Sequence, residues 1–187
     1  MASFEAFHGL VAELEGGYQN RKDDPGNKNS LGVFVGTKYG ISAPVYEKWI
    51  GYPPTSYDMQ YLSKETAKDI FKSLYWDKMN ASKINSQAIA ETLVDHGINA
   101  GTGTSGRIMQ RVLNNSFGKS LLVDGIVGNN TIAAINSVDE TELFKAFSQA
   151  RISDYETKPN KAFWLNIWKN RVYRIADKFG IEVKKKR

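Results

Sequence analysis

Two carboxylates near the amino terminus have the residue types and the spacing that acid–base chemistry could use. Glu15 is followed directly by Gly16 and Gly17, and Asp24 comes nine positions later, in a polar stretch before Pro25. One carboxyl group in apolar surroundings and a second in water are the arrangement with which enzymes hydrolyse glycosidic bonds. Glu15 taken alone is better explained as a solvated residue at a helix end, and on spacing alone Asp24 is equally well explained as a turn residue before Pro25.

The element that must position Glu15 is a helix that begins at Ser3 and stops at the glycine pair. Val11 lies one helical turn before Glu15, so the carboxyl group emerges beside the buried face. Apolar neighbours and the negative end of the helix dipole both disfavour its ionised form, and we expect a raised pKa for Glu15, as a general acid requires. The apolar positions that predict this helix are Phe4, Phe7, Val11 and Leu14.

Composition narrows the chemistry further. The 187 residues include no cysteine and only two histidines, His8 and His96. Without cysteine there are no disulfides, thiolate metal sites or cysteine nucleophiles, and two histidines are too few for a zinc site built on several imidazoles. Neither histidine accompanies the G-x-S-x-G pattern of serine hydrolases. We therefore expect carboxylate chemistry with no metal and no cofactor.

The charge of the chain limits its partners. A net charge of +5 and a pI near 9.2 favour an anionic partner such as nucleic acid, a membrane surface or a cell-wall polymer. Because 20 acidic residues offset the 25 basic ones and no basic recognition helix is visible, we expect no nucleic acid partner. No window approaches the roughly eighteen apolar residues that cross a bilayer, so we expect no stable membrane insertion.

Periodicity predicts a mainly α-helical chain. Residues 19–43 are polar and rich in turn formers around one short apolar island, which predicts a loop or small β-hairpin. Within 86–100 nearly every side of the predicted helix is apolar, as expected of a buried central helix. The helices predicted after this loop region span 44–50, 63–76, 85–100, 104–114, 129–136, 139–156 and 161–179.

Several short motifs resemble those of glycosyl hydrolase family 108, the phage and bacterial N-acetylmuramidases. The most specific is Glu15-Gly16-Gly17-Tyr18, followed in order by other segments over nearly the whole chain. These segments are Asp23-Asp24-Pro25-Gly26, Thr37-x-x-Gly40-Ile41-Ser42, Tyr75-Trp76, Asp95-x-x-x-Asn99-x-Gly101, Val123-Asp124-Gly125-Ile126-Val127-Gly128 and Trp168-x-Asn170-Arg171-Val172.

This resemblance implies a lysozyme-like fold that cleaves the β-1,4 bond between N-acetylmuramic acid and N-acetylglucosamine in peptidoglycan. The catalytic glutamate of the family corresponds to Glu15. The wider phage lysozyme pattern of glutamate, aspartate and threonine corresponds to Glu15, Asp24 and Thr37, the last two holding or activating water. Residues 27–36 make the link to Thr37 longer than is usual in the family, and we expect a longer hairpin along one wall of the cleft.

Three further residues are candidates for contact with the substrate. Tyr18, just past the glycine pair, is the aromatic residue expected beside the sugar. Asp95 and Asn99 share one face of the predicted central helix, and for them a buried structural network is as good an interpretation as substrate contact. His96 stands where the family more usually has an aromatic residue, and we interpret it as a packing residue.

The carboxyl-terminal part resembles the small domains that bind peptidoglycan. Residues 123–131 have the turn-and-helix pattern of those domains, and we favour a packing role for them over wall binding. The domain prediction is a lysozyme-like catalytic region at 1–103 and a helical, peptidoglycan-binding-like region at 104–187, packed into one unit.

Other functions remain open at this point. A lytic transglycosylase would use the same glutamate with the muramic C6 hydroxyl in place of water, and a non-catalytic module would bind peptidoglycan or assist secretion. The start of the chain lacks the pattern of a signal peptide. We therefore expect synthesis in the cytoplasm, action on peptidoglycan glycan strands of the cell wall, and release through a holin or a secretion system.

Overall fold

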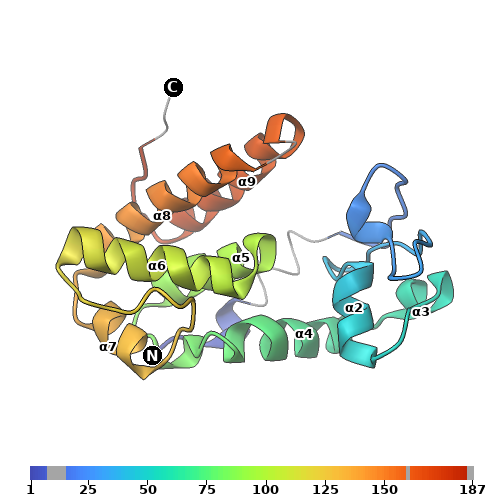
Figure 1. Cartoon of the computed structure of the whole chain (residues 1–187), viewed down its shortest axis with the longest axis horizontal. Helices are drawn as coiled ribbons and strands as arrows, with labels where there is room; N and C mark the ends of the chain where they lie inside the picture. The colour runs from blue at the N-terminus through green and yellow to red at the C-terminus, as the bar shows by residue number, and fades with distance from the viewer. Residues whose placement is uncertain (8–15, 159–160, 185–187) are drawn as a thin grey trace. The chain divides into compact units, whose positions relative to one another are not determined.

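The structure is a computed structural model that describes residues 1–7, 16–158 and 161–184. Residues 4–7 are helical, as predicted, while the rest of the helix expected to carry Glu15 lies outside the described residues. The contact pattern divides the chain into two compact units, Phe4–Leu74 and Tyr75–Arg187, and Met1–Ser3 belong to the second. Figure 1 shows the helices of both.

The amino-terminal unit consists of a long loop and short helices. The loop contains the 3-10 turn η1 (Pro25–Asn27) and pairs with itself through isolated antiparallel bridges, which matches the loop or small hairpin predicted for 19–43. Helices α2 (Ala43–Ile50), α3 (Ser56–Tyr61) and α4 (Lys64–Phe71) follow it. The sequence did not predict α3, which begins in a capping box between Thr55 and Asp58.

The predicted helix 63–76 is present in two parts. Ser63 starts α4 by accepting a hydrogen bond from the backbone N–H of Thr66. Beyond Phe71 the helix widens into the π-helical segment η2 (Lys72–Asp77). Helical periodicity predicts the combined length well, but it does not distinguish the wider π-helical turns.

The carboxyl-terminal unit is a helical bundle around α5 (Gln87–Ala100). Helix α5 is buried continuously from Ala88 to Gly97 and packs against α6, α8 and α9, which confirms the predicted central helix. The short turn η3 (Ala81–Lys83) precedes it. The helices that follow are α6 (Thr102–Phe117), α7 (Asn129–Asn136), α8 (Glu140–Thr157) and α9 (Lys161–Lys178).

The predicted fold class is confirmed, because the described chain is mainly helical and its β pairing consists of isolated bridges. In the parts of the chain that the structure describes, no helix has both the length and the apolar character needed to span a membrane.

Candidate active site

The chain just beyond Glu15 is joined to the loop that carries Thr37. Glu15 itself lies outside the described residues. The carbonyl oxygen of Gly16, the next residue, accepts a hydrogen bond of 3.2 Å from the backbone N–H of Tyr39. Three residues further on, Gln19 and Thr37 form an antiparallel bridge, with backbone N–H to O distances of 2.9 and 2.8 Å. The sequence neighbours of Glu15 therefore run alongside residues 37–39.

Asp24 is held in the same loop by hydrogen bonds to both of its carboxylate oxygens. Its Oδ1 accepts from the backbone N–H of Gly26 at 2.9 Å, and its Oδ2 accepts from the side-chain amide of Gln19 at 3.1 Å. Asp23 instead lies exposed and pairs at 2.6 Å with Arg21. Of the two adjacent aspartates, only Asp24 is therefore attached to the residue that pairs with Thr37.

The hydroxyl of Thr37 is buried and has no hydrogen-bond partner among the described residues. Buried hydroxyl groups in folded proteins are nearly always hydrogen-bonded to protein or water. Thr37 thus brings an uncommitted hydroxyl oxygen to the segment that runs beside Gly16 and Gln19.

Tyr18 is half-buried and supports the loop. Its hydroxyl donates to the carbonyl oxygen of Val35 at 3.1 Å, and its ring packs with Tyr46 against a small apolar cluster. A Cβ atom at Gly36, whose φ is +97°, would lie 2.4 Å from the Tyr18 ring, so only glycine fits beneath it. Contact between Tyr18 and a sugar stays a prediction, since these contacts leave its role in substrate binding untested.

Asp95 lies in a buried network that joins three helices of the carboxyl-terminal unit. Its side chain is 1% exposed, and it receives hydrogen bonds of 2.5 Å from Arg151 on α8 and 2.6 Å from Arg171 on α9. Arg151 also donates to Thr92 at 2.7 Å and to Tyr155 at 3.0 Å. Burial alone would raise the pKa of Asp95, but the two guanidinium groups outweigh it and hold the pKa below its usual value.

These contacts match the structural interpretation of Asp95, and its contact with substrate stays a prediction. Asn99 lies exposed one turn later and donates to the backbone carbonyl of Asp95 at 2.9 Å, so the two side chains occupy different surroundings. His96 is fully buried between Phe147 and Tyr155 in edge-to-face contacts, in agreement with a packing role. Asp95 and Asn99 belong to the carboxyl-terminal unit, whereas Tyr18, Asp24 and Thr37 belong to the other.

Gln19 and Asn27 organise the candidate site, and sequence reasoning missed both. Their side-chain amides bond reciprocally at 2.9 and 3.0 Å. Asn27 is fully buried, and its backbone carbonyl also accepts from Val35 and Gly36. In the sequence they are two amides in a polar loop, and no periodicity marks them, because their importance comes from contacts across the loop.

Comparisons with known proteins find a family match for each of two parts of the chain. Residues 9–101 match the family described as Glycosyl hydrolase 108, and residues 104–172 match one described as Predicted Peptidoglycan domain. The fold is similar to the solved structure of SagA from Brucella abortus, with a TM-score of 0.82 and 22% sequence identity over 95% of this chain and 94% of that chain. A search of curated proteins finds no match.

These findings define the chain as a mainly helical glycoside hydrolase that acts on peptidoglycan. Residues 9–101 belong to glycosyl hydrolase family 108, as the motifs indicate, and the match to a predicted peptidoglycan domain follows them. The family matches adjoin between residues 101 and 104, whereas the contact pattern divides the chain between Leu74 and Tyr75. The domain boundary at 103–104 stays a prediction.

Proposed function

We propose that the protein is an N-acetylmuramidase that hydrolyses the β-1,4 bond between N-acetylmuramic acid and N-acetylglucosamine, with Glu15 as its general acid. Asp24 and Thr37 hold the attacking water or stabilise the positive charge that develops on the sugar. The observation that carries the proposal is the connection of Asp24 and Thr37 through Gln19, in the segment that directly follows Glu15.

The hydrogen bonds through Gln19 support one site that contains both Asp24 and Thr37, because they join residues that lie apart in the sequence. The Asp24 carboxylate is fixed by the Gln19 amide, and the Gln19 backbone pairs with Thr37 in both directions. A positioned carboxylate and an uncommitted hydroxyl can together orient a water molecule. The match of residues 9–101 to a glycoside hydrolase family supports the same reaction class.

In the proposed reaction, the protonated carboxyl group of Glu15 gives its proton to the bridging oxygen as the bond from that oxygen to C1 of the muramic acid breaks. The N-acetylglucosamine side leaves with a new hydroxyl group. Water adds to C1 through its oxygen, and the proton that it loses replaces the one that Glu15 gave up. The products are a reducing end on the muramic acid and a 4-hydroxyl group on the N-acetylglucosamine, and Glu15 is protonated again. The transition state resembles an oxocarbenium ion, which a neighbouring carboxylate such as Asp24 stabilises electrostatically.

The test is to digest purified peptidoglycan with the wild-type protein and with Glu15→Gln, reduce the products with borohydride, and identify the sugar ends by mass spectrometry. We expect reduced muramic acid ends from the wild type and a loss of about 100-fold or more in Glu15→Gln. Glu13→Gln, two positions earlier, is the matched control and should retain activity. Anhydro-muramic ends would assign a lytic transglycosylase, and no new ends on a wall that the protein binds would leave a non-catalytic module.

The adjacent aspartates give a second matched pair. Asp24→Asn should lower the rate of cleavage by about 100-fold, because its oxygens are the ones held by Gln19 and Gly26. Asp23→Asn removes only an exposed pair with Arg21 and should leave the rate nearly unchanged. Equal losses in both variants, or none in Asp24→Asn, would refute the role given to Asp24. Thr37→Val, which keeps the side-chain shape but removes the hydroxyl, tests the third residue in the same assay.

A further inference from the structure

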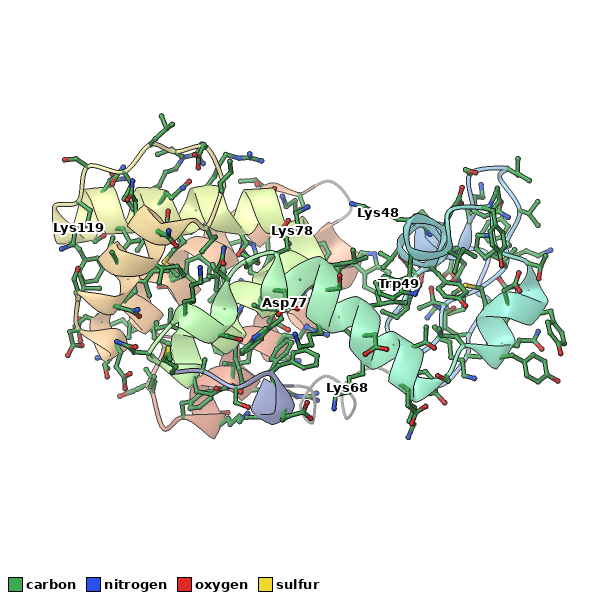
Figure 2. All side chains as sticks on the ribbon, turned by 90° about the horizontal axis from the view of Figure 1, so that it is seen from below. Lys48, Trp49, Lys68, Asp77, Lys78 and Lys119 are labelled. Atoms are coloured by element: carbon green, nitrogen blue, oxygen red, sulfur yellow. The ribbon has the colours of Figure 1, made fainter. Side chains whose placement is uncertain are left out.

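A cavity of about 350 Å³ lies beside the loop that connects α6 to α7. The loop leaves α6 near Lys119, which is labelled in Figure 2, and ends at Gly128, the N-cap of α7. The loop, the two helices and all the residues that line the cavity belong to the carboxyl-terminal unit. The lining includes Gln110, Leu122, Asp124, Ile126 and Asn129.

The loop is held firmly against α6. The buried side-chain amide of Gln110 donates to the Asp124 carboxylate at 2.8 Å and to the Ile126 carbonyl at 3.1 Å, and its oxygen accepts from the Gly125 N–H at 2.8 Å. Asn114 bonds Leu121 in both directions, at 2.9 and 2.8 Å. A loop with this many fixed backbone groups presents its remaining side chains in one defined arrangement.

Gly125 shows how closely the loop approaches α6. Its φ is +84°, and a Cβ atom there would lie 2.5 Å from the carbonyl oxygen of Gly103 on α6. The Asp124-Gly125 turn is therefore required for packing, as the sequence suggested, and this packing fixes the residues on either side of it.

Two apolar side chains of this fixed loop face solvent. Leu122 is 79% exposed and Ile126 is 68% exposed, and both line the cavity. A single exposed leucine needs no explanation, but two apolar side chains on a rigid loop beside a cavity are typical of a surface that binds something.

Groups of both charge signs lie around the same cavity. The hydrogen bond from Gln110 and that from the Ile126 N–H hold the pKa of Asp124 below its usual value, so its carboxylate is ionised at neutral pH. Positive polarity comes from the first turn of α7, which has no side-chain cap, and from Lys83. Lys83 does not line the cavity, but its ammonium group lies 3.4 Å from Oδ1 of the lining residue Asn129. The cavity therefore suits a ligand that has both a positive and a negative group.

We propose that this cavity binds the stem peptide of peptidoglycan. Such a peptide combines alanine methyl groups, free carboxylates and, in most walls, the amino group of a diamino acid. The methyl groups would contact Leu122 and Ile126, the ammonium group would pair with Asp124, and a carboxylate would meet the first N–H groups of α7 and Lys83. The site deepens the proposed function, on which it rests for the wall as partner, and the match of residues 104–172 to a predicted peptidoglycan domain supports that partner.

The lining favours peptide over sugar. Sugar rings bind well against aromatic faces, yet none of the residues that line this cavity, all within the described chain, is aromatic. Instead the lining offers amides, hydroxyls, one carboxylate and aliphatic side chains, the groups that pair with a peptide backbone and small aliphatic residues.

The first experiment is to titrate the full-length Glu15→Gln protein with a synthetic stem pentapeptide containing lysine and to follow backbone amide shifts by NMR. We expect saturable shifts concentrated in residues 120–131. A peptide-free glycan tetrasaccharide is the comparison ligand and should leave these amides unmoved. Shifts of these amides with the glycan but not with the peptide would overturn the peptide assignment, and no shift with either would overturn the site.

The second experiment uses variants of the exposed apolar residues, which can be changed at little cost to the fold. The double variant Leu122→Ser and Ile126→Ser should bind the pentapeptide roughly tenfold more weakly. Ile167→Ser, on α9 in the same unit and 48% exposed in the wild type, is the control and should bind normally. Unchanged affinity in the double variant would contradict the docking of methyl groups on this loop.

Cleavage assays separate the failure of this proposal from the failure of the proposed function. On peptide-free glycan strands, the double variant should cleave at the wild-type rate, whereas on intact peptidoglycan at low substrate concentration it should be slower. If the wild type binds the pentapeptide at 120–131 but cleaves no glycan, the muramidase proposal fails and the peptide site stands. If the wild type cleaves glycan but the amides of residues 120–131 do not respond to the peptide, the peptide site fails and the muramidase proposal stands.

Discussion

Replacing Asp95 with asparagine should destabilise the protein strongly, because the buried Asp95 carboxylate pairs with both Arg151 and Arg171. Asparagine keeps the shape of the side chain but removes a negative charge with which both guanidinium groups pair. Arg151 has a fully buried side chain, and that of Arg171 is 11% exposed, so water cannot replace the lost carboxylate.

The expected loss is about 3–5 kcal/mol of unfolding free energy, the usual cost of removing one partner from a buried ion pair. For a chain of this length each kcal/mol corresponds to about 2–4 °C, so the midpoint of thermal unfolding should fall by about 6–20 °C. Asp23→Asn, which removes an exposed pair with Arg21, is the control and should leave the midpoint nearly unchanged.

The assay is thermal unfolding followed by circular dichroism, together with peptidoglycan cleavage at a temperature where both proteins are folded. A loss below about 1 kcal/mol in Asp95→Asn, combined with a large fall in activity, would refute the structural reasoning and favour substrate contact instead. The pH gives a further check. Because the folded pKa of Asp95 is depressed, its stabilisation is present above the unfolded pKa of about 3.9 and is lost as the pH falls through the folded pKa. The difference between wild type and variant should shrink accordingly in acid.

Two further predictions concern the carboxyl-terminal unit. Gly106→Ala would place a Cβ atom 2.3 Å from the Gly125 carbonyl oxygen and should lower the unfolding free energy measured by chemical denaturation by about 1–3 kcal/mol. Gly103→Ala, where the nearest atom to the new Cβ is 3.6 Å away, is the control and should be neutral or slightly stabilising. Equal effects of the two variants would refute the tight contact between the loop and α6. Burial lowers the pKa of His96 more than the nearby Asp154 raises it, so unfolding free energy should fall as the pH drops below about 6.5. His96→Phe should reduce that pH dependence in thermal melts at pH 7.5 and 5, and an unchanged dependence would contradict a neutral, buried His96.

Much of the fold is local and could be predicted from the sequence. Helices α2 and α7 and the central helix α5 lie close to their predicted ranges, because apolar periodicity and capping residues are properties of adjacent stretches of chain. Helix α3 was missed because it is short and is marked mainly by the capping box at Thr55, a weaker signal than a long apolar pattern. The same local character makes the glutamate and glycine motif at Glu15 recognisable without any structure.

The candidate site was predicted only in part, since its organisation depends on contacts between distant residues. Asp23 and Asp24 are adjacent and identical in type, and only the folded loop shows that Asp24 is bonded to Gln19 while Asp23 faces solvent with Arg21. The sequence offered no way to rank Gln19 above any other polar residue in the loop.

By itself, then, the sequence determined the helical class, the family and the identity of the candidate acid, because each depends on residue types at short spacings. The tertiary structure decided which of those residues have partners. Asp95 is the clearest case: its motif allowed either substrate contact or a structural role, and the structure surrounds it with Arg151 and Arg171, which lie 56 and 76 positions away. A residue's burial and the charges around it are set by how distant segments pack, and short-range patterns carry no information about that packing.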